Sequence, residues 1–397
     1  MPNEKPLKIA MFTNNFFPFI GGVPISIHRL TKGLRQLGHT VYIFAPKYPQ
    51  QEKDSDPHVV RFKLLIYLKA KLFHFPIVNI FSSQVEREFA KHDFDLIHAH
   101  HPFWMGKKAL SLGRKHNIPV VLTFHTRYDR YYKNLPMFKL LFKHSISHQM
   151  VKIFSERCDS IIAPTETAKR YLEHLKITRP IDILPTGVEL KDLPAEEIHA
   201  LRRRFAPDDN VLLCSVSRLA TEKNLLFLID CIEYVAKHTN VKFQFIMVGD
   251  GPEKPALVDL IQRKNLQDVV RLIGNIPVDE VHKYYLASDI FVFTSKSETQ
   301  GMVLVEAMTG RCPIIAVSAG GVDDVVIDDF NGYKTPEDVI TWGNRLIELL
   351  EHPDKLQIMA KNAYDYSTSY SLEAIAAQAE KIYKREVQKI QHENITG

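Results

Sequence analysis

The sequence has no run that approaches the ~20 unbroken apolar residues of a membrane-spanning helix. No apolar signal segment stands at the start, because the polar stretch from Met1 to Pro6 leads directly into the first predicted strand. Internal repeats of about 20 to 50 residues and low-complexity tracts are also missing. What remains is an ordinary globular composition, 45% apolar and 24% charged, and we expect a soluble protein of the cytoplasm.

Cysteine is scarce. The four cysteines are scattered without the spacing of a metal site, at Cys158, Cys214, Cys231 and Cys312. We therefore expect reduced, buried thiols of a cytosolic protein, and we predict no metal site in the chain.

A large excess of one charge is absent as well, since the net charge is only +5. The two halves of the sequence, however, differ in the sign of their charge. Residues 1–190 hold 28 Lys and Arg against 15 Asp and Glu, and the remaining residues hold 23 against 31. A basic first half suggests a partner that is anionic, such as a lipid headgroup surface or a nucleic acid. Basic residues also decorate ordinary solvated helices, so that alternative stays open.

The 397 residues exceed the size at which one hydrophobic core usually keeps growing, so we expect two domains. Short apolar runs alternate with longer amphipathic ones, which predicts buried parallel strands separated by helices. The predicted strands are 8–12, 41–45, 95–99, 120–124 and 160–163, then 212–216, 243–248, 270–273, 290–293 and 314–317. Two such series predict an α/β fold with two doubly wound, Rossmann-like parallel sheets.

Turn-forming residues between Leu184 and Pro194 mark the predicted domain boundary. We expect one domain at residues 1–190, a second at 195–370, and a C-terminal helical segment at 371–397. Further helices are predicted at 24–37, 106–116 and 138–157.

Open α/β sheets bind ligands beyond the carboxyl ends of their strands, so residues that directly follow a strand are candidates. Gly21 and Gly22 follow the first strand and let the backbone approach a ligand closely, as do Gly249 and Gly251 in the second half. A tight turn explains either glycine pair at least as well.

Several histidines stand at strand ends. His125 follows the strand at 120–124, where it can hydrogen-bond a sugar hydroxyl or lend charge to a reacting centre. Its position favours this reading over a packed or surface histidine. His98, His100 and His101 resemble a metal cluster, but no carboxylate accompanies them and neighbours along a strand face opposite ways. We favour a structural or acceptor-side role for these three.

Charged residues gather at two strand ends of the second half. Arg218 and Lys223 bracket a turn into a helix, where a helix start already favours anions, and together they could hold a diphosphate. Solvated cations near a turn are an equally good explanation. Glu298 and Glu306 flank the start of the helical run after 290–293, and their carboxylates can accept hydrogen bonds from sugar hydroxyls.

The chain resembles, over nearly its whole length, the retaining nucleotide-sugar glycosyltransferases of family 4. The motifs that carry the resemblance are Glu298-x7-Glu306, Ser217-Arg218-x4-Lys223-Asn224 and Gly249-Asp250-Gly251-Pro252. The resemblance implies the GT-B fold, in which two Rossmann-like domains face each other across a cleft and a C-terminal helix crosses back to the N-terminal domain. The basic first domain would bind the acceptor and the second the nucleotide sugar.

The resemblance also implies roles for individual residues. Arg218 and Lys223 would neutralise the diphosphate, Glu306 would bind the ribose, and Glu298 would bind the donor sugar. His125 would lie near the anomeric carbon, which makes His125, Glu298, Arg218 and Lys223 the implied catalytic set. The residues implied to bind the donor are Gly21, Gly22, Arg218, Lys223, Gly249, Gly251, Glu298, Gly301, Met302, Val303 and Glu306.

For the reaction, the resemblance implies retention of the anomeric configuration, with departure and attack on the same face of the sugar. Fixed cations and helix dipoles would stabilise the leaving diphosphate. No cofactor is therefore expected to be required, although a divalent cation could stimulate the reaction.

The acceptor is predicted from the basic half. The stretches 61–75 and 127–152 interleave cations with large apolar side chains, which would suit the interface of an anionic bilayer, with each cation worth ~1 kcal/mol. Helices that pack on the core with solvated cations are the alternative. No nucleic-acid module is recognised, and no nucleic-acid partner is expected.

The segments 123–128 and 299–301 are similar to the subgroup that glucosylates diacylglycerol in bacterial membranes. This similarity implies transfer of glucose from UDP-glucose to diacylglycerol, by a peripheral protein on the inner face of the cell membrane, giving an α-linked glycolipid. One departure is Val322-Asp323-Asp324, where many relatives place a glutamate, and Asp324 could substitute for it.

Two alternatives remain. One is a hexosyltransferase, including a mannosyl or galactosyl transferase, that acts on a phosphoinositol lipid or a polysaccharide precursor. The other is a non-catalytic sensor of nucleotide sugars, which the intact Arg218, Lys223, Glu298 and Glu306 disfavour.

Overall fold

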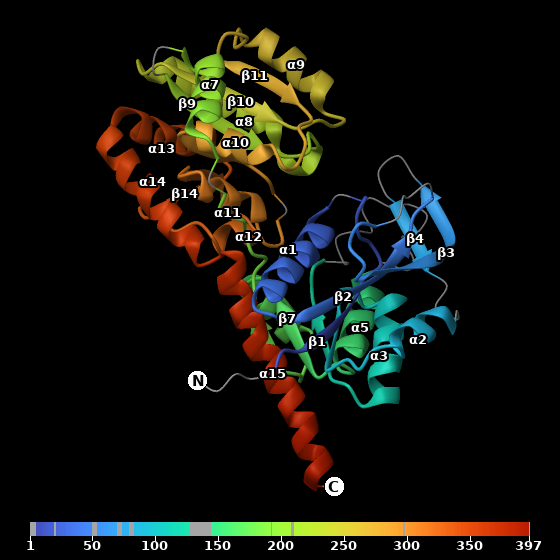
Figure 1. Ribbon diagram of the computed structural model, residues 1–397. Helices are drawn as coiled ribbons and strands as arrows, with labels where there is room; N and C mark the ends of the chain where they lie inside the picture. The colour runs from blue at the N-terminus through green and yellow to red at the C-terminus, as the bar shows by residue number, and fades with distance from the viewer. Residues whose placement is uncertain are drawn as a thin grey trace. The chain divides into compact units, whose positions relative to one another are not determined.

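The computed structural model describes residues 5–19, 21–49, 54–69, 74–78, 83–126, 144–191, 193–207, 210–296 and 298–396. The chain divides into two compact units (Figure 1). The first unit comprises Met1–Gly187 and Leu372–Gly397, and the second comprises Val188–Ser371.

The sheet of the first unit has eight strands in the order β4-β3-β2-β1-β5-β6-β7-β8. Neighbouring strands pair in parallel, except that β3 and β4 pair antiparallel. The strands are β1 (Lys8–Phe12), β2 (Thr40–Lys47), β3 (Val59–Lys69), β4 (His74–Val78), β5 (Leu96–Ala99), β6 (Val120–Thr123), β7 (Ser160–Ala163) and β8 (Ile181–Ile183).

Helices from both ends of the sequence cover this sheet. They are α1 (Gly22–Gln36), α2 (Ser83–Phe89), α3 (Met105–His116), α5 (His144–Ser155), α6 (Glu166–His174) and α15 (Leu372–Thr396). The final helix α15 lies beside α1 (Figure 1), and Gly33 permits the contact, because a Cβ there would lie 2.5 Å from the Leu372 carbonyl oxygen. Ile375 and Tyr383 of α15 are buried in the same apolar cluster as Ile9 of β1. The end of the chain is therefore part of the first unit's core.

The sheet of the second unit has six strands, all parallel, in the order β11-β10-β9-β12-β13-β14. The strands are β9 (Val211–Val216), β10 (Phe243–Val248), β11 (Val270–Gly274), β12 (Ile290–Phe293), β13 (Ile314–Val317) and β14 (Gly332–Thr335). The helices are α7 (Ala195–Phe205), α8 (Leu225–His238), α9 (Lys254–Arg263), α10 (Val281–Ala287), α11 (Met302–Thr309), α12 (Gly320–Asp323), α13 (Val339–Glu351) and α14 (Pro353–Thr368), with a short 3₁₀ turn, η4, at Thr221–Lys223.

Two apolar clusters cover the two faces of the second sheet. One contains residues of α8, α9 and α13, with Trp342 fully buried, and the other contains residues of α7, α10 and α11. Gly343 lets α13 approach α8 closely, since a Cβ there would lie 2.4 Å from the ring of Tyr234. Both faces are thus shielded from water, as parallel sheets require.

The predicted fold class is confirmed: each unit carries a doubly wound parallel sheet. Five predicted strands match the structure at both ends, namely 8–12, 160–163, 243–248, 290–293 and 314–317. Strands β3, β4, β8 and β14 were not predicted. The helical alternative for the stretch 61–75 is wrong for its described residues, because residues 59–69 and 74–78 are strands that pair antiparallel. Residues 127–143 of the second basic stretch lie outside the described residues.

Each sheet has one position where the chain order reverses. In the first unit it lies between β1 and β5, and in the second between β9 and β12. Loops that leave two neighbouring strands diverge at such a switch point, and this is where doubly wound sheets bind ligands.

Within the described residues, no helix combines the length and the apolar character that crossing a bilayer requires.

Candidate active site

In the second unit, the turn after β9 is fixed to the end of β12. The carbonyl oxygen of Glu222 accepts hydrogen bonds from the Lys296 amide (3.0 Å) and the Ser295 hydroxyl (3.2 Å). The Thr294 hydroxyl donates to the carbonyls of Lys223 (3.0 Å) and Asn224 (3.1 Å). These bonds hold the η4 turn against the loop that carries Glu298, at the switch point of the sheet.

This arrangement brings Lys223 and Glu298 together. The Lys223 ammonium donates to Glu298 Oε1 at 2.5 Å, and the two side chains are only 20% and 15% exposed. Lys223 Nζ also lies 5.6 Å from the centre of the Phe293 ring. The predicted phosphate ligand and the predicted sugar ligand therefore form one ion pair, although 75 positions separate them.

Arg218 is paired as well. Its guanidinium donates to Glu222 Oε1 at 2.7 Å, and both side chains are close to half exposed. Burial tends to raise the pKa of Glu222, but the hydrogen bond from Arg218, a backbone hydrogen bond and the charges of Arg218 and Lys223 together outweigh it, and the pKa is lowered. Glu222 was not among the predicted site residues, although its position four residues after Arg218 places it within reach of that side chain.

Gly249 and Gly251 allow a second loop to approach the first. Gly249 has a φ of +134°, and a Cβ there would lie 1.9 Å from the Ser217 carbonyl oxygen. A Cβ at Gly251 would lie 2.3 Å from the Leu219 carbonyl oxygen, and the Leu219 amide donates to the carbonyl of Asp250 at 3.0 Å. In this structure the glycines bring the loops after β9 and β10 into contact.

The start of α11 lies next to Glu298. Gly301, with a φ of +69°, begins the helix, and the amides of Met302 and Val303 belong to the first turn, whose N–H groups have no partner within a helix. The Gly321 amide donates to the Glu298 carbonyl at 3.2 Å, which fixes this loop.

Glu306 lies one turn inside α11, where the Tyr285 hydroxyl donates to its Oε2 at 3.4 Å. Asp324 directly follows the short helix α12 and is partly buried.

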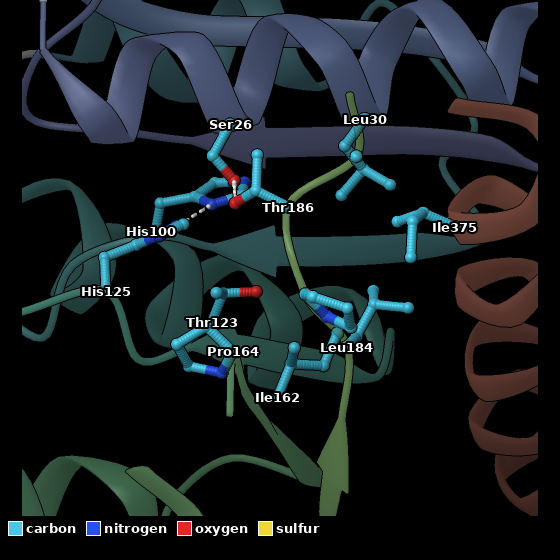
Figure 2. Close-up of a pocket in the computed structure, with 12 residues that line it drawn as sticks. Ser26, Leu30, His100, Thr123, His125, Ile162, Pro164, Leu184, Thr186 and Ile375 are labelled. Atoms are coloured by element: carbon cyan, nitrogen blue, oxygen red, sulfur yellow. Dashed lines mark hydrogen bonds between the residues drawn. The ribbon is translucent and has the colours of Figure 1, made fainter. Parts of the chain in front are cut away.

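In the first unit, histidines gather where β5 and β6 end. Figure 2 shows His100 and His125 facing each other, with 2.9 Å between Nδ1 of His100 and Nε2 of His125. His98 bonds on both sides, through Nε2 to the Thr123 hydroxyl (2.6 Å) and through Nδ1 to the Tyr383 hydroxyl of α15 (2.8 Å).

Burial keeps these imidazoles neutral. It lowers the pKa of His98 and of His101 to about 3, and the pKa of His125 to about 4. It also lowers the pKa of His100 well below 6.5, helped by the neighbouring histidines. Of the two roles predicted for His125, hydrogen bonding therefore fits the structure at neutral pH better than a positive charge.

The same contacts occupy ring nitrogens that a metal would need. Nδ1 of His101 accepts a hydrogen bond from the Asn14 amide at 3.2 Å, and both nitrogens of His98 are engaged. Across the described part of the chain, no group of three or more His, Cys, Asp or Glu side chains is placed to hold a metal ion. The histidines instead tie β1, β5 and β6 to α15.

Gly21 is the N-cap of α1 in the first unit, and Gly22 is the first residue of the helix. Gly21 is extended and packs near the Phe19 ring, whereas a Cβ at Gly22 would meet nothing within 4 Å. The surface beside Gly22 is therefore open. The structure brings Arg218, Lys223, Glu298 and Gly301 to neighbouring loops of the second unit, with Glu306 one turn inside α11, while His125, Gly21 and Gly22 belong to the first unit.

Two family models match the chain. The one described as Glycosyltransferase Family 4 covers residues 20–192, and the one described as Glycosyl transferases group 1 covers residues 198–366.

Individual proteins match over most of their length. The chain is 30% identical over 390 residues to an alpha-monoglucosyldiacylglycerol synthase of Acholeplasma laidlawii, which covers 95% of this chain and 96% of the relative. It is 29% identical over 332 residues to a synthase of the same name from Streptococcus pneumoniae, covering 82% and 74%. Among solved structures, Anabaena HepE in complex with UDP and glucose has a TM-score of 0.72 at 19% identity and covers 96% of this chain.

Proposed function

Because the chain belongs to glycosyltransferase family 4 and has the GT-B fold of two Rossmann-like domains, we propose that it transfers a hexose from a nucleotide sugar to a membrane lipid with retention of anomeric configuration. The donor we propose is UDP-glucose, the acceptor is diacylglycerol, and the product is an α-linked glycolipid. The names of the two curated relatives support this choice of acceptor and sugar.

The observation that carries the proposal is the Lys223–Glu298 pair at the switch point of the second sheet. A cation that can neutralise a phosphate stands one hydrogen bond from a carboxylate that can accept from sugar hydroxyls. On donor binding, the Lys223 ammonium, with three N–H donors, would serve the diphosphate and Glu298 together. Arg218 would add a planar fork to the same diphosphate.

The start of α11 would also contact the donor. Amides of Met302 and Val303 and the positive end of the helix would meet sugar or phosphate oxygens. Glu306, one turn further, would accept hydrogen bonds from the ribose, and the glycine loops at Gly249 and Gly251 would border the nucleotide.

In the reaction we propose, the bond between the anomeric carbon and the diphosphate oxygen breaks as the acceptor oxygen bonds to the same face. The acceptor proton passes to a diphosphate oxygen. Arg218, Lys223 and the α11 amides stabilise the charge that develops on the diphosphate. These groups are sufficient for a metal-independent reaction, which a divalent cation could still stimulate. Neutral His125 would hydrogen-bond a hydroxyl of the sugar or acceptor.

A surface of the first unit supports a lipid environment for the acceptor. A groove of about 580 Å³ runs along α3 and α5, lined by Lys107 and Arg157 together with Ile146 and Ile153. Ile146 and Ile153 are 43% and 46% exposed. Exposed apolar side chains flanked by cations suit the interface of an anionic membrane. We therefore propose peripheral attachment to the cytoplasmic face of the cell membrane.

The proposal is tested by offering radiolabelled UDP-glucose, UDP-galactose and GDP-mannose with vesicles that contain diacylglycerol, then identifying the lipid product. We expect glucosyl-diacylglycerol and release of UDP that depends on diacylglycerol. Donor turnover that depends instead on a phosphoinositol lipid or a polysaccharide precursor would replace the acceptor. Donor binding without any turnover on membrane extract would show a sensor rather than an enzyme.

A further inference from the structure

His100 is buried next to His125, and only one of its two ring nitrogens has a hydrogen-bond partner in the part of the chain that the structure describes. Its side chain is 1% exposed, Nδ1 bonds to His125, and Nε2 is buried without a hydrogen-bond partner among the described residues. A buried polar atom without a partner is uncommon and calls for a physical reason.

A small cavity adjoins this histidine pair. His100, His125 and Thr123 line it together with Ser26 and Thr186, and its volume is about 20 Å³ (Figure 2). This is room for about one water molecule, which needs two or more polar partners to bind. Among the lining residues, the hydroxyls of Thr123, Ser26 and Thr186 and the unpartnered Nε2 of His100 are the polar groups that can provide them.

Only one proton lies between His100 and His125, because both rings are neutral. Either His100 donates from Nδ1, or His125 donates from Nε2. The first choice leaves Nε2 of His100 as an acceptor in the cavity, and the second leaves it as a buried N–H donor. Buried N–H groups without partners are rarer than acceptors without partners.

The hydroxyl pair at the cavity favours the first choice. The Thr186 hydroxyl donates to Ser26 Oγ at 2.9 Å, which leaves the Ser26 hydrogen to be donated onward. A water in the cavity can accept from Ser26 and donate to Nε2 of His100. Donation then runs in one direction, from Thr186 through Ser26, the water and His100 to His125.

We propose that His100 is a positioning residue for His125: it donates Nδ1–H to Nε2 of His125, holds one water at its own Nε2, and so fixes the His125 proton on Nδ1. His125 then offers an N–H donor to the hydroxyl or ring oxygen of a sugar, and its Nε2 cannot serve as a general base. This inference rests on the proposed function only for the role of His125 in turnover.

The C-terminal helix contributes to the same arrangement. The centre of the His98 ring lies 4.0 Å from that of the His100 ring, with the two planes tilted by 39°, and Tyr383 of α15 and Thr123 fix His98 from both sides. The ring of His100 is therefore held in one orientation by side chains of β5, β6 and α15.

Two substitutions at position 100 separate the hydrogen bond from simple packing. His100→Asn places an amide nitrogen near the position of Nδ1 and can still donate to His125, whereas His100→Leu keeps volume and removes the donor. We expect His100→Leu to lower kcat by about 10- to 100-fold with little change in KM for the donor, because His125 loses its orientation. We expect His100→Asn to restore most of that loss.

His39→Leu is the matched control. His39 is also buried in the first unit, 4% exposed, and its Nδ1 accepts the Leu7 amide at 3.0 Å, away from His125. Its loss should lower stability without changing kcat per folded molecule. Equal kcat losses in His39→Leu, His100→Leu and His100→Asn would reduce His100 to a packing role and overturn the proposal.

A direct measurement does not depend on turnover or on any substitution at position 100. Nitrogen-15 NMR of the histidine-labelled wild-type protein, with His125 assigned from His125→Gln, reports which ring nitrogen carries the proton. We expect Nδ1–H for His125, and a proton on Nε2 would overturn the proposal. If His125→Gln keeps full activity while the Nδ1–H form is observed, the proposed role of His125 in turnover fails and the inference about His100 stands.

Discussion

The two units place their candidate residues at the same position of a doubly wound sheet, but the residues differ in charge. In both, the loops that carry candidate residues leave the sheet where the chain order reverses. The first unit places neutral histidines there, with His98, His100 and His101 buried and His125 partly buried, and the second places cations that are paired with carboxylates and partly exposed. Fixed positive charge would suit the proposed nucleoside diphosphate, and neutral hydrogen-bonding groups would suit the hydroxyl of the proposed lipid acceptor. Shared topology therefore positions a site without deciding its chemistry.

Low pH should destabilise the first unit more than the second, and this is the largest effect that we expect. The histidines of the first unit titrate near 6.5 when unfolded, but the pKa of folded His125 is about 4 and those of His98 and His101 are about 3. Below pH 6.5 the unfolded state thus binds protons that the folded state excludes. The free energy of unfolding is therefore highest above that pH. It falls as the pH drops toward 4, by up to about 1.4 kcal/mol per pH unit for each histidine.

Hydrogen exchange read by mass spectrometry at pH 7.5 and 5.5, with rates corrected for pH, checks this. Amides of β5 and β6 should lose protection before those of β9 and β12. In the second unit, the lowered pKa of Glu222 keeps its pair with Arg218 ionised through this range. Equal loss of protection in both sheets would show that the buried histidines are not the cause.

Removing the two cations of the second unit should have the next largest effect. In Arg218→Gln/Lys223→Gln, hydrogen bonds to a charged diphosphate are lost, each worth about 1.5 to 3 kcal/mol, so UDP-glucose should bind at least about 100-fold more weakly in calorimetry. Lys237→Gln/Arg263→Gln is the matched control, because these cations form exposed pairs on α8 and α9. Wild-type affinity in the first variant would refute the proposed donor site.

Membrane attachment should depend on cations of the first unit alone. Lys107, Arg114 and Arg157 are exposed beside α3 and α5, so replacing all three by Gln should weaken binding to anionic vesicles by roughly 100-fold at low salt, at about 1 kcal/mol for each cation. Sedimentation with vesicles measures this, and added salt should weaken wild-type binding similarly.

The control removes three exposed cations from the second unit, with Lys237, Arg263 and Lys361 changed to Gln. Net charge then changes equally in both variants. Equal losses of vesicle binding, or equal wild-type binding to neutral and anionic vesicles, would rule out a localised anionic-lipid surface.

The sequence predicted much of the fold because most strands are apolar runs bounded by turn formers. The runs 243–248 and 290–293 are of this kind, and their bounds are confirmed. Strands β8 and β14 have only 3 and 4 residues and include polar ones, so no apolar run marks them. In β3, cations at Arg61 and Lys63 interrupt the apolar pattern, which concealed a strand paired with β4.

Sequence motifs located candidate residues but not their partners. Lys223 and Glu298 each follow a predicted strand, yet their pairing depends on the bonds that tie the η4 turn to β12. Similarly, the position of His125 at a strand end was visible, whereas its bond to His100 and the support from Tyr383 require the register of β5 with β6 and the docking of α15. Such contacts are set by tertiary structure, which no local pattern records.

The smallest effect concerns the carboxylate that pairs with Arg218. Glu222 and a diphosphate would compete for the same guanidinium, so Glu222→Gln should bind UDP-glucose more tightly. An exposed pair is worth about 0.2 to 1 kcal/mol, which limits the gain to about 5-fold. The turn itself should survive, because its bonds to Ser295 and Lys296 use the Glu222 carbonyl and not the side chain.

Asp259→Asn is the control, since it removes the partner of Arg263 in an exposed pair of the same spacing. Calorimetry that showed weaker donor binding in Glu222→Gln would mean that the carboxylate holds Arg218 in its binding position and does not compete with the donor. Tighter donor binding in Glu222→Gln would mean that the paired cation is restrained until the donor arrives. Weaker binding would mean that the pair orients the cation for the donor in advance.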